Sequence, residues 1–143
     1  MPWVGTVTVV GVVVLVALIV LFFRIRMKDL LDEYVKKRSA SSRVCSRADY
    51  VEGIERIPVA LALTSDTIYY ENPDLQASME LRNIDEVEYD DETATGQSVT
   101  GKTLRLRSHG HTFEFILDAN SARLWQQALP PHRLDEGPAA QAV

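Results

Sequence analysis

The chain begins with an unbroken apolar run. Residues 4–23 contain no charged side chain and consist mainly of Val, Leu, Ile and Phe. These twenty residues, at about 1.5 Å each, would form a helix of roughly 30 Å, which is the thickness of the hydrocarbon core of a bilayer. A buried helix of a soluble protein is the weaker interpretation, because the run has no polar face and Val is a mediocre helix former in water. The run therefore predicts a transmembrane helix.

A cleaved signal peptide is the other interpretation of this run. Such a peptide has a basic stretch before a shorter apolar segment, and small residues at a cleavage site after it. The residues before the run, Met-Pro-Trp, carry no basic side chain, and the run ends in Phe22, Phe23 and Arg24. We therefore expect residues 1–23 to be retained as a membrane anchor.

The helical pattern continues for a short distance beyond the anchor. Residues 24–38 contain no Gly or Pro, and four larger side chains recur at helical spacing: Leu30, Leu31, Tyr34 and Val35. The membrane helix is therefore predicted to continue to about residue 38. Residues 38–43, RSASSR, break the pattern and are typical of a linker. We assign residues 24–48 to a juxtamembrane helix and linker.

From residue 49 the hydrophobic period becomes that of β-strands. Residues 59–71 predict a hairpin with a turn at positions 65–66, which pairs apolar side chains on one face: Leu63 with Ile68, and Leu61 with Tyr70. Alternation resumes between residues 79 and 89, where Asn83 separates two short predicted strands. Residues 91–101 are polar and contain Gly, which is typical of a mobile loop.

Residues 102–117 predict a second hairpin, with its turn at His109 and Gly110. This register pairs Leu106 with Phe113 and Leu104 with Phe115 on the core face. It also pairs Arg105 with Glu114 on the opposite face, which we expect to be solvated. Because the register is coherent on both faces, the strand pairing is well specified.

An amphipathic helix is predicted after this hairpin. Asp118 or Asn120 is a candidate N-cap, and Pro130 and Pro131 end the helix. One face carries an apolar stripe of Ala122, Trp125, Ala128 and Leu129. Residues 130–143, rich in Pro and Ala, predict a disordered tail. The expected core contains eight side chains: Leu61, Leu63, Ile68, Leu104, Leu106, Phe113, Phe115 and Trp125.

Charge divides the chain into parts of opposite sign. Residues 24–47 hold eight Lys or Arg and three Asp or Glu, a net charge of +5. From residue 48 on, the chain holds seven basic and 17 acidic residues, a net charge of −10. Cations next to the C-terminal end of a membrane helix favour a cytoplasmic location for the domain beyond it. The single cysteine, Cys45, cannot form an internal disulfide and agrees with this orientation; the inverted topology is the alternative.

The order of several antiparallel strands and one terminal helix resembles the pleckstrin-homology (PH) superfamily, especially its small bacterial and GRAM-type members. LTSDTIYYEN is similar to their early hairpin, ELRNIDEVEY to the next strand–turn–strand segment, and FEFILDANSARLWQQAL to the last strand and helix. The resemblance covers residues 49–129. It implies a bent antiparallel barrel that the C-terminal helix caps, with Trp125 as the family's helix tryptophan.

The resemblance implies a binding module, and two kinds of partner stay open. Many PH domains bind inositol phospholipids through cations beside the first hairpin loop, but the candidate loop here, residues 64–67, has an acid and no cation. The preferred hypothesis is a non-catalytic module that binds or scaffolds a protein partner. The alternative is that a basic collar binds anionic lipid, at about 1 kcal/mol per cation. Its six candidate residues are Arg24, Arg26, Lys28, Lys36, Lys37 and Arg38.

Other activities have little support in the sequence. The acidic domain is a poor candidate for nucleic-acid binding, which needs Lys and Arg on phosphates. His109 and His111 lack a third partner for zinc, the acid run at residues 85–92 lacks the pattern of an EF-hand loop, and Arg105 with its basic neighbours is better explained as strand exterior than as a phosphate site. No catalytic motif is present, so we expect neither an enzyme nor a cofactor. The anchor has no dimerisation motif, and the oligomeric state stays open.

Overall fold

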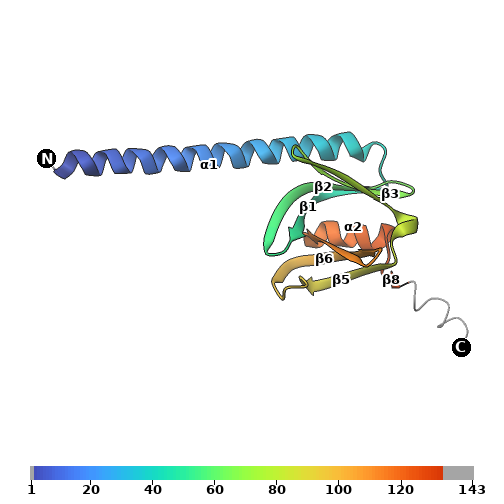
Figure 1. Ribbon diagram of the computed structural model, residues 1–143. Helices are drawn as coiled ribbons and strands as arrows, with labels where there is room; N and C mark the ends of the chain where they lie inside the picture. Colours follow the sequence, from blue (N-terminus) through green and yellow to red (C-terminus); the bar gives the residue numbers. More distant parts are fainter. Residues whose placement is uncertain (1, 134–143) are drawn as a thin grey trace, which may run out of the picture. The chain divides into compact units, whose positions relative to one another are not determined.

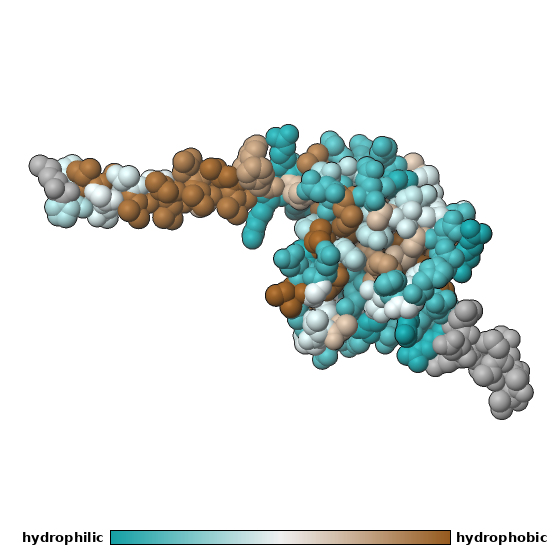
Figure 2. Space-filling view, viewed as in Figure 1, coloured by the Kyte–Doolittle hydropathy of each residue, from teal (hydrophilic) through white to brown (hydrophobic). Residues whose placement is uncertain are grey.

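Figure 1 shows the computed structural model, which describes residues 2–133. The chain divides into two compact units, Met1–Leu30 and Leu31–Val143. Helix α1 (Pro2–Ser39) is continuous through the predicted anchor and ends one residue beyond the predicted position. It is a helix long and apolar enough to cross a membrane, and its large apolar side chains up to Ile25 are 45–64% exposed. Figure 2 shows these side chains as a brown surface along α1 and a mainly teal surface over the described part of the second unit.

The anchor satisfies its few polar groups within the helix. The Thr6 hydroxyl donates to the carbonyl oxygen of Pro2 at 3.2 Å, and the Thr8 hydroxyl donates to that of Val4 at 2.8 Å. A hydroxyl bonded back to its own helix can enter an apolar environment at little cost, because no donor is left without an acceptor. The two threonines are therefore compatible with a membrane span.

The second unit is built on one antiparallel sheet of eight strands, in the order β4-β3-β2-β1-β7-β6-β5-β8. The strands are β1 (Val44–Glu52), β2 (Glu55–Leu63), β3 (Thr67–Asn72), β4 (Leu75–Glu80), β5 (Glu86–Glu92), β6 (Ser98–Ser108), β7 (His111–Leu117) and β8 (His132–Arg133). A short 3-10 helix, η1 (Leu81–Asn83), joins β4 to β5, and helix α2 (Ala119–Ala128) follows β7. Figure 1 shows the strands curving around α2.

The sheet is not the closed barrel that the sequence suggested. Strand β4 pairs only with β3, while β5 pairs with β6 and β8, so β4 and β5 are not bonded to one another. The connection between them explains the opening. The Leu81 N–H donates to the Asp66 carbonyl, whereas the Asp85 N–H donates to the Arg107 carbonyl. The connecting segment thus starts with a bond to the β2–β3 turn and ends with a bond to β6, and β4 and β5 do not pair.

Both predicted hairpins have the predicted register. Leu61 lies opposite Tyr70 and Leu63 opposite Ile68 in β2–β3. In β6–β7 the same holds for Leu104 with Phe115, Leu106 with Phe113 and Arg105 with Glu114. The second turn has positive φ at both His109 (50°) and Gly110 (79°), which is the backbone geometry of a two-residue type I′ hairpin.

Strand β1 was missed and begins within the predicted linker. Its inward positions are Val44, Ser46, Ala48 and Tyr50, which mix small and polar residues with apolar ones and so hide the alternation. The inward serine has a specific role, because its hydroxyl accepts a hydrogen bond from Trp125 Nε1 at 2.9 Å. The second unit therefore starts its sheet at Val44, ahead of the predicted boundary at residue 49.

Helix α2 supplies the centre of the core. Asp118, one of the two predicted candidates, caps its N-terminus. The Asp118 carboxylate accepts a hydrogen bond from the Ser121 N–H at 2.7 Å. Trp125 is completely buried, and Ala122 and Leu129 are nearly so. Of the eight expected core side chains, seven are fully buried, and Phe113 is partly buried against them.

Two predicted irregular segments differ from the structure. Strands β5 and β6 occupy both ends of the segment 91–101, which leaves only residues 93–97 as a loop. Within β6, position 101 requires glycine, because a Cβ there would lie 1.9 Å from the Leu117 carbonyl oxygen of β7. In the predicted tail, His132 and Arg133 form β8 against β5. Residues 134–143 lie outside the described part of the chain.

Candidate interaction surfaces

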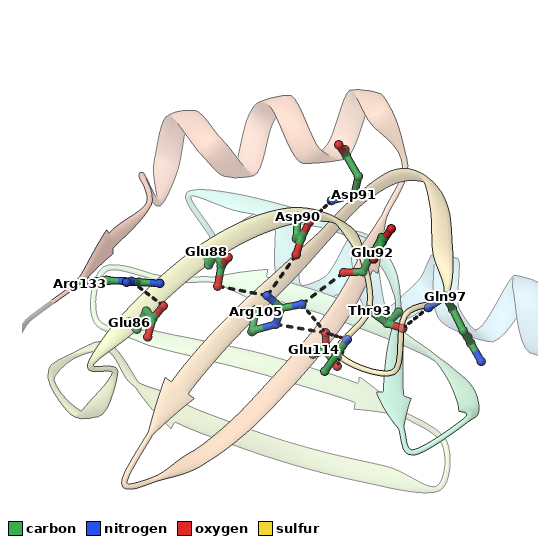
Figure 3. Close-up of polar contacts among 11 residues, drawn as sticks. Glu86, Glu88, Asp90, Asp91, Glu92, Thr93, Gln97, Arg105, Glu114 and Arg133 are labelled. Carbon is green, nitrogen blue, oxygen red and sulfur yellow. Dashed lines mark hydrogen bonds and ion pairs between the residues drawn. The ribbon is translucent and has the colours of Figure 1, made fainter.

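The outer face of β5–β7 carries a compact ionic network centred on Arg105 (Figure 3). Arg105 Nη1 lies 3.1 Å from Glu88 Oε2 and 3.4 Å from Asp90 Oδ2, and Nη2 lies 3.2 Å from Glu114 Oε2. Nη2 also donates to the Glu92 carbonyl at 3.3 Å. Alternation explains the arrangement, because every second residue of β5 points away from the core and three of these neighbours are on β5.

Glu114 is buried, although its face of the sheet was expected to be solvated. Its side chain is only 9% exposed, and it accepts the Ala94 N–H at 2.9 and 3.2 Å in addition to Arg105. The loop 93–97 closes over it and is held by its own bonds between Thr93 and Gln97. The loop is thus a structured cover, clamped by one carboxylate.

The network is negative despite its central cation. One guanidinium serves three carboxylates, so two negative charges are not balanced by Arg105. Burial acts to lower the pKa of Arg105, but hydrogen bonds to Glu88 and Glu114 outweigh it, and this pKa lies above its ordinary value. The Asp91 N–H, with help from Arg105, holds the pKa of Asp90 below its ordinary value. The surface therefore remains anionic at neutral pH.

The neighbouring basic side chains each lie beside an acid. Lys102 pairs with Asp91, and Arg133 pairs with Glu86 at 2.9 Å. Arg107 is exposed opposite Glu86 on the adjacent strand. This arrangement matches a mixed strand exterior, in which acids separate the cations.

A second surface lies on the outer face of β1–β3, where residues 31–39 of α1 cover β2. Asp32 pairs with Arg47 of β1 at 2.8 Å, and the Cys45 thiol donates to the Val35 carbonyl at 3.5 Å. On the other side, Arg38 reaches Glu71 of β3. Because these contacts reach both neighbours of β2, the helix must cross above the strand between them. The outward residues of β2 there, Ala60 and Ala62, are accordingly 2% and 1% exposed.

Arg38 closes this surface. Its Nη2 lies 2.5 Å from Glu71 Oε1, its Nε donates to Oε2 at 3.2 Å, and its guanidinium stacks 4.2 Å from the centre of the Tyr69 ring. Glu71 is only 6% exposed, so its charge depends on this partner. The hydrogen bonds and charge of Glu71 raise the pKa of Arg38 above its ordinary value.

The six candidate lipid-binding cations therefore fall into two groups. Arg38 is occupied by Glu71 and Tyr69. The other five are exposed along α1: Arg24, Arg26, Lys28, Lys36 and Lys37. Of the six, only these five side chains present their charge to the surroundings without an ion pair inside the described part of the chain.

The first hairpin loop is not the one that the sequence suggested. With β1 in place, the first tip is formed by Gly53 and Ile54 between Glu52 and Glu55, and the Ile54 side chain is 78% exposed. The acidic loop at residues 64–67 belongs to the second hairpin. Both tips thus carry acids, although Arg56 follows the first.

An open groove of about 480 Å³ lies between the end of α1 and α2. It is lined by Ser39, Ser42, Arg43, Val44, Cys45, Leu124, Gln127 and Ala128. Burial raises the pKa of the Cys45 thiol to about 11, against a lowering effect of Arg38. Within residues 2–133 no three His, Cys, Asp or Glu side chains are grouped to hold a metal ion.

Sequence reasoning missed the helix-covered surface. Neither Glu71 nor Arg47 stands out in a strand, and Arg38 was assigned to the lipid-binding group. The available signal was the alternation VALAL in β2, where Ala occupies each outward position. Small outward residues in a strand indicate that something packs closely on that face.

Comparison of this chain with protein-family models, with curated proteins and with solved structures gives no match.

Proposed function

We propose that the chain is a single-pass membrane protein that presents a PH-like domain to the cytoplasm as a non-catalytic module for binding or scaffolding a protein. The apolar part of α1 supports the membrane anchor, and the cations that follow it support the cytoplasmic orientation. The strand order and the helix α2 beside the curved sheet are compatible with an open, PH-like arrangement.

The observation that carries this proposal is the negative outer face of β5–β7. Glu88 and Asp90, with side chains 38% and 42% exposed, and the exposed Glu92 carry the charge of the Arg105 network into solvent. Such a face is repelled by anionic lipid and complements a basic protein surface. Complementary charge would favour a basic partner over others and speed its association. The partner is therefore expected to be a protein with a cluster of Lys or Arg.

Co-purification from native membranes tests this proposal. We expect the full chain to retain a partner that is lost with Asp90→Lys/Glu92→Lys, and whose binding weakens as salt is raised. The matched control is Glu52→Lys/Glu55→Lys, which makes the same change of charge at the exposed β1–β2 tip. Equal loss with both variants would show that only net charge matters, and would contradict a specific role for the β5–β7 face.

Anionic lipid is the second candidate partner, and one observation favours it. Lys36 and Lys37 are exposed in the last turn of α1, next to the ordered sheet. In this function the exposed cations of the collar bind anionic headgroups, which repel the acidic face of β5–β7.

The orientation needs its own test. Cys45 is a poor reporter, because it is partly buried and its pKa is raised. Glu55→Cys in a Cys45→Ser background places a thiol at an exposed tip. We expect a membrane-impermeant maleimide to label it only after the cells are permeabilised. Labelling of intact cells would establish the inverted topology.

A further inference from the structure

We propose that residues 31–39 form a latch, a helical segment that can leave the β1–β3 face and whose closed state is held by the Arg38–Glu71 pair. The latch belongs entirely to the second unit of the chain. Its operation does not depend on which partner the acidic face binds.

The latch is held by few contacts. Leu31 is the single residue of α1 that is buried, at 3% exposure, and beneath the segment β2 offers only alanines. The Asp32–Arg47 pair is about half exposed on both sides, so water screens it. Arg38–Glu71 is the shielded polar contact, with side chains 31% and 9% exposed. The closed state therefore depends strongly on one ion pair.

Loss of either partner destabilises the closed state of the latch more than the open state. Without Arg38, a closed latch would bury the Glu71 carboxylate with no cation, which is strongly unfavourable. An open latch would return Glu71 to water. With Glu71→Gln, Arg38 loses its charge partner and gains by moving into solvent. Both changes consequently favour the open state.

The connection at residues 40–43 lets the latch move without disturbing the sheet. It lies between the end of α1 and the start of β1. The Ser41 N–H and the Ser42 hydroxyl both bond to the Arg38 carbonyl, whereas Arg43 is fixed to the Leu63 carbonyl of β2 and the Ala128 carbonyl of α2, so the segment can move ahead of Arg43. Opening would uncover Ala60, Ala62 and the Cys45 thiol. The β1–β3 face would then change from a covered to an exposed surface, while the inner core stays packed.

Cys45 reports this movement in the unmodified chain. Closed, its thiol lies against the Val35 carbonyl with a pKa of about 11; open, the value returns towards the ordinary 9.0. At pH 8 this change raises the reactive thiolate fraction by roughly a hundredfold, since the thiolate is the nucleophile. Arg38 lowers the pKa of Cys45 and Glu71 raises it. Their direct electrostatic effects on labelling are therefore opposite.

The experiment measures alkylation of Cys45 by iodoacetamide at pH 8 in the full chain in detergent micelles. We expect slow alkylation of the wild type, and at least tenfold faster alkylation with both Arg38→Ala and Glu71→Gln. Arg82→Ala, which removes an exposed ion pair with Glu80, is the matched control and should leave the rate unchanged. If Arg38→Ala slows the reaction while Glu71→Gln accelerates it, the helix has stayed closed and the proposal is wrong.

Hydrogen exchange separates latch opening from global unfolding. The amides of β6 and β7 should keep wild-type protection in both variants, while those of residues 31–39 lose protection. If β6 and β7 exchange as fast as Cys45 reacts, the thiol is reached only through unfolding of the whole sheet, and no latch exists.

Discussion

The two halves of the sheet share one core but differ on their outer faces. On the β1–β3 half a helix covers two alanines, and a single ion pair, Arg38–Glu71, closes the edge. On the outer face of the β5–β7 half, no helix of the described residues 2–133 covers the strands. Three carboxylates surround Arg105 there instead. The outward residues of a strand thus record what lies above it. Small side chains mark a packed cover, and alternate charges mark a face in contact with water or a partner.

The largest expected effect tests whether the two halves form one unit. Trp125→Ala should lower the free energy of unfolding by about 3–5 kcal/mol, because it removes a completely buried indole whose Nε1 bonds to β1 while its helix packs against β6 and β7. Denaturant unfolding of the full chain in micelles measures this. Leu124→Ala, on the exposed side of the same helix, is the control and should cost less than about 1 kcal/mol. An unchanged melting temperature with Trp125→Ala would refute the central position of α2.

A second prediction asks whether the exposed half also depends on a buried carboxylate. Glu114→Ala should cost about 1–3 kcal/mol, because the Ala94 N–H loses its acceptor while Arg105 keeps two other carboxylates. The loop 93–97 should lose amide protection first. Glu88→Ala removes a more exposed partner of Arg105 and should cost less than about 1 kcal/mol. Equal costs would mean that burial does not distinguish the two acids.

The difference between the halves also explains how far the sequence could be interpreted. Both hairpin registers follow from alternation, because large apolar side chains dominate the inner face of β2, β3, β6 and β7, and the Trp125 face of α2 follows from helical spacing. Strand β1 did not follow, since its inward Ser46 is there to accept from Trp125, a contact 79 residues away. Long-range partners of this kind leave no local pattern.

The candidate surfaces were harder to predict for the same reason. The acidic character of β5 is visible in the sequence. The burial of Glu114 is not, because it depends on the loop 93–97 between β5 and β6. Arg38, Lys36 and Lys37 are neighbours of one chemical type and were grouped together. Within residues 2–133, only Arg38 of these three has an acidic partner, Glu71, which lies on a strand 33 residues later in the sequence. This contact distinguishes Arg38 from Lys36 and Lys37.

A third prediction sharpens this separation of the cations. For residues 24–143, once circular dichroism has verified that this fragment folds, Lys36→Gln/Lys37→Gln should weaken flotation with anionic vesicles by roughly thirtyfold. This assumes about 1 kcal/mol for each exposed cation near the surface. The control Arg56→Gln/Arg82→Gln removes two cations beyond the collar and should have little effect. Absence of vesicle binding at low salt would rule out the lipid function altogether.

The smallest predicted effect concerns the link between the exposed half and α2. The Tyr89 hydroxyl of β5 donates to the Leu129 carbonyl at 2.8 Å, where α2 ends. Tyr89→Phe leaves this carbonyl without its donor and should lower the free energy of unfolding by about 1 kcal/mol. Tyr50 and Tyr70 remain in both proteins, so their ionisation cancels in the comparison.

The direction in which this stability difference changes with pH tests whether the Tyr89 hydroxyl makes the contact. Burial raises the pKa of Tyr89 far above its ordinary value, so the folded state favours the protonated phenol. Its contribution is fully present below the ordinary tyrosine pKa of about 10 and is lost as pH rises towards the folded value. The stability difference between wild type and Tyr89→Phe should therefore be constant from pH 6 to pH 9 and shrink above about pH 10. A difference that grows with alkaline pH would show that the phenolate is tolerated, and that β5 does not hold the end of α2 through this hydroxyl.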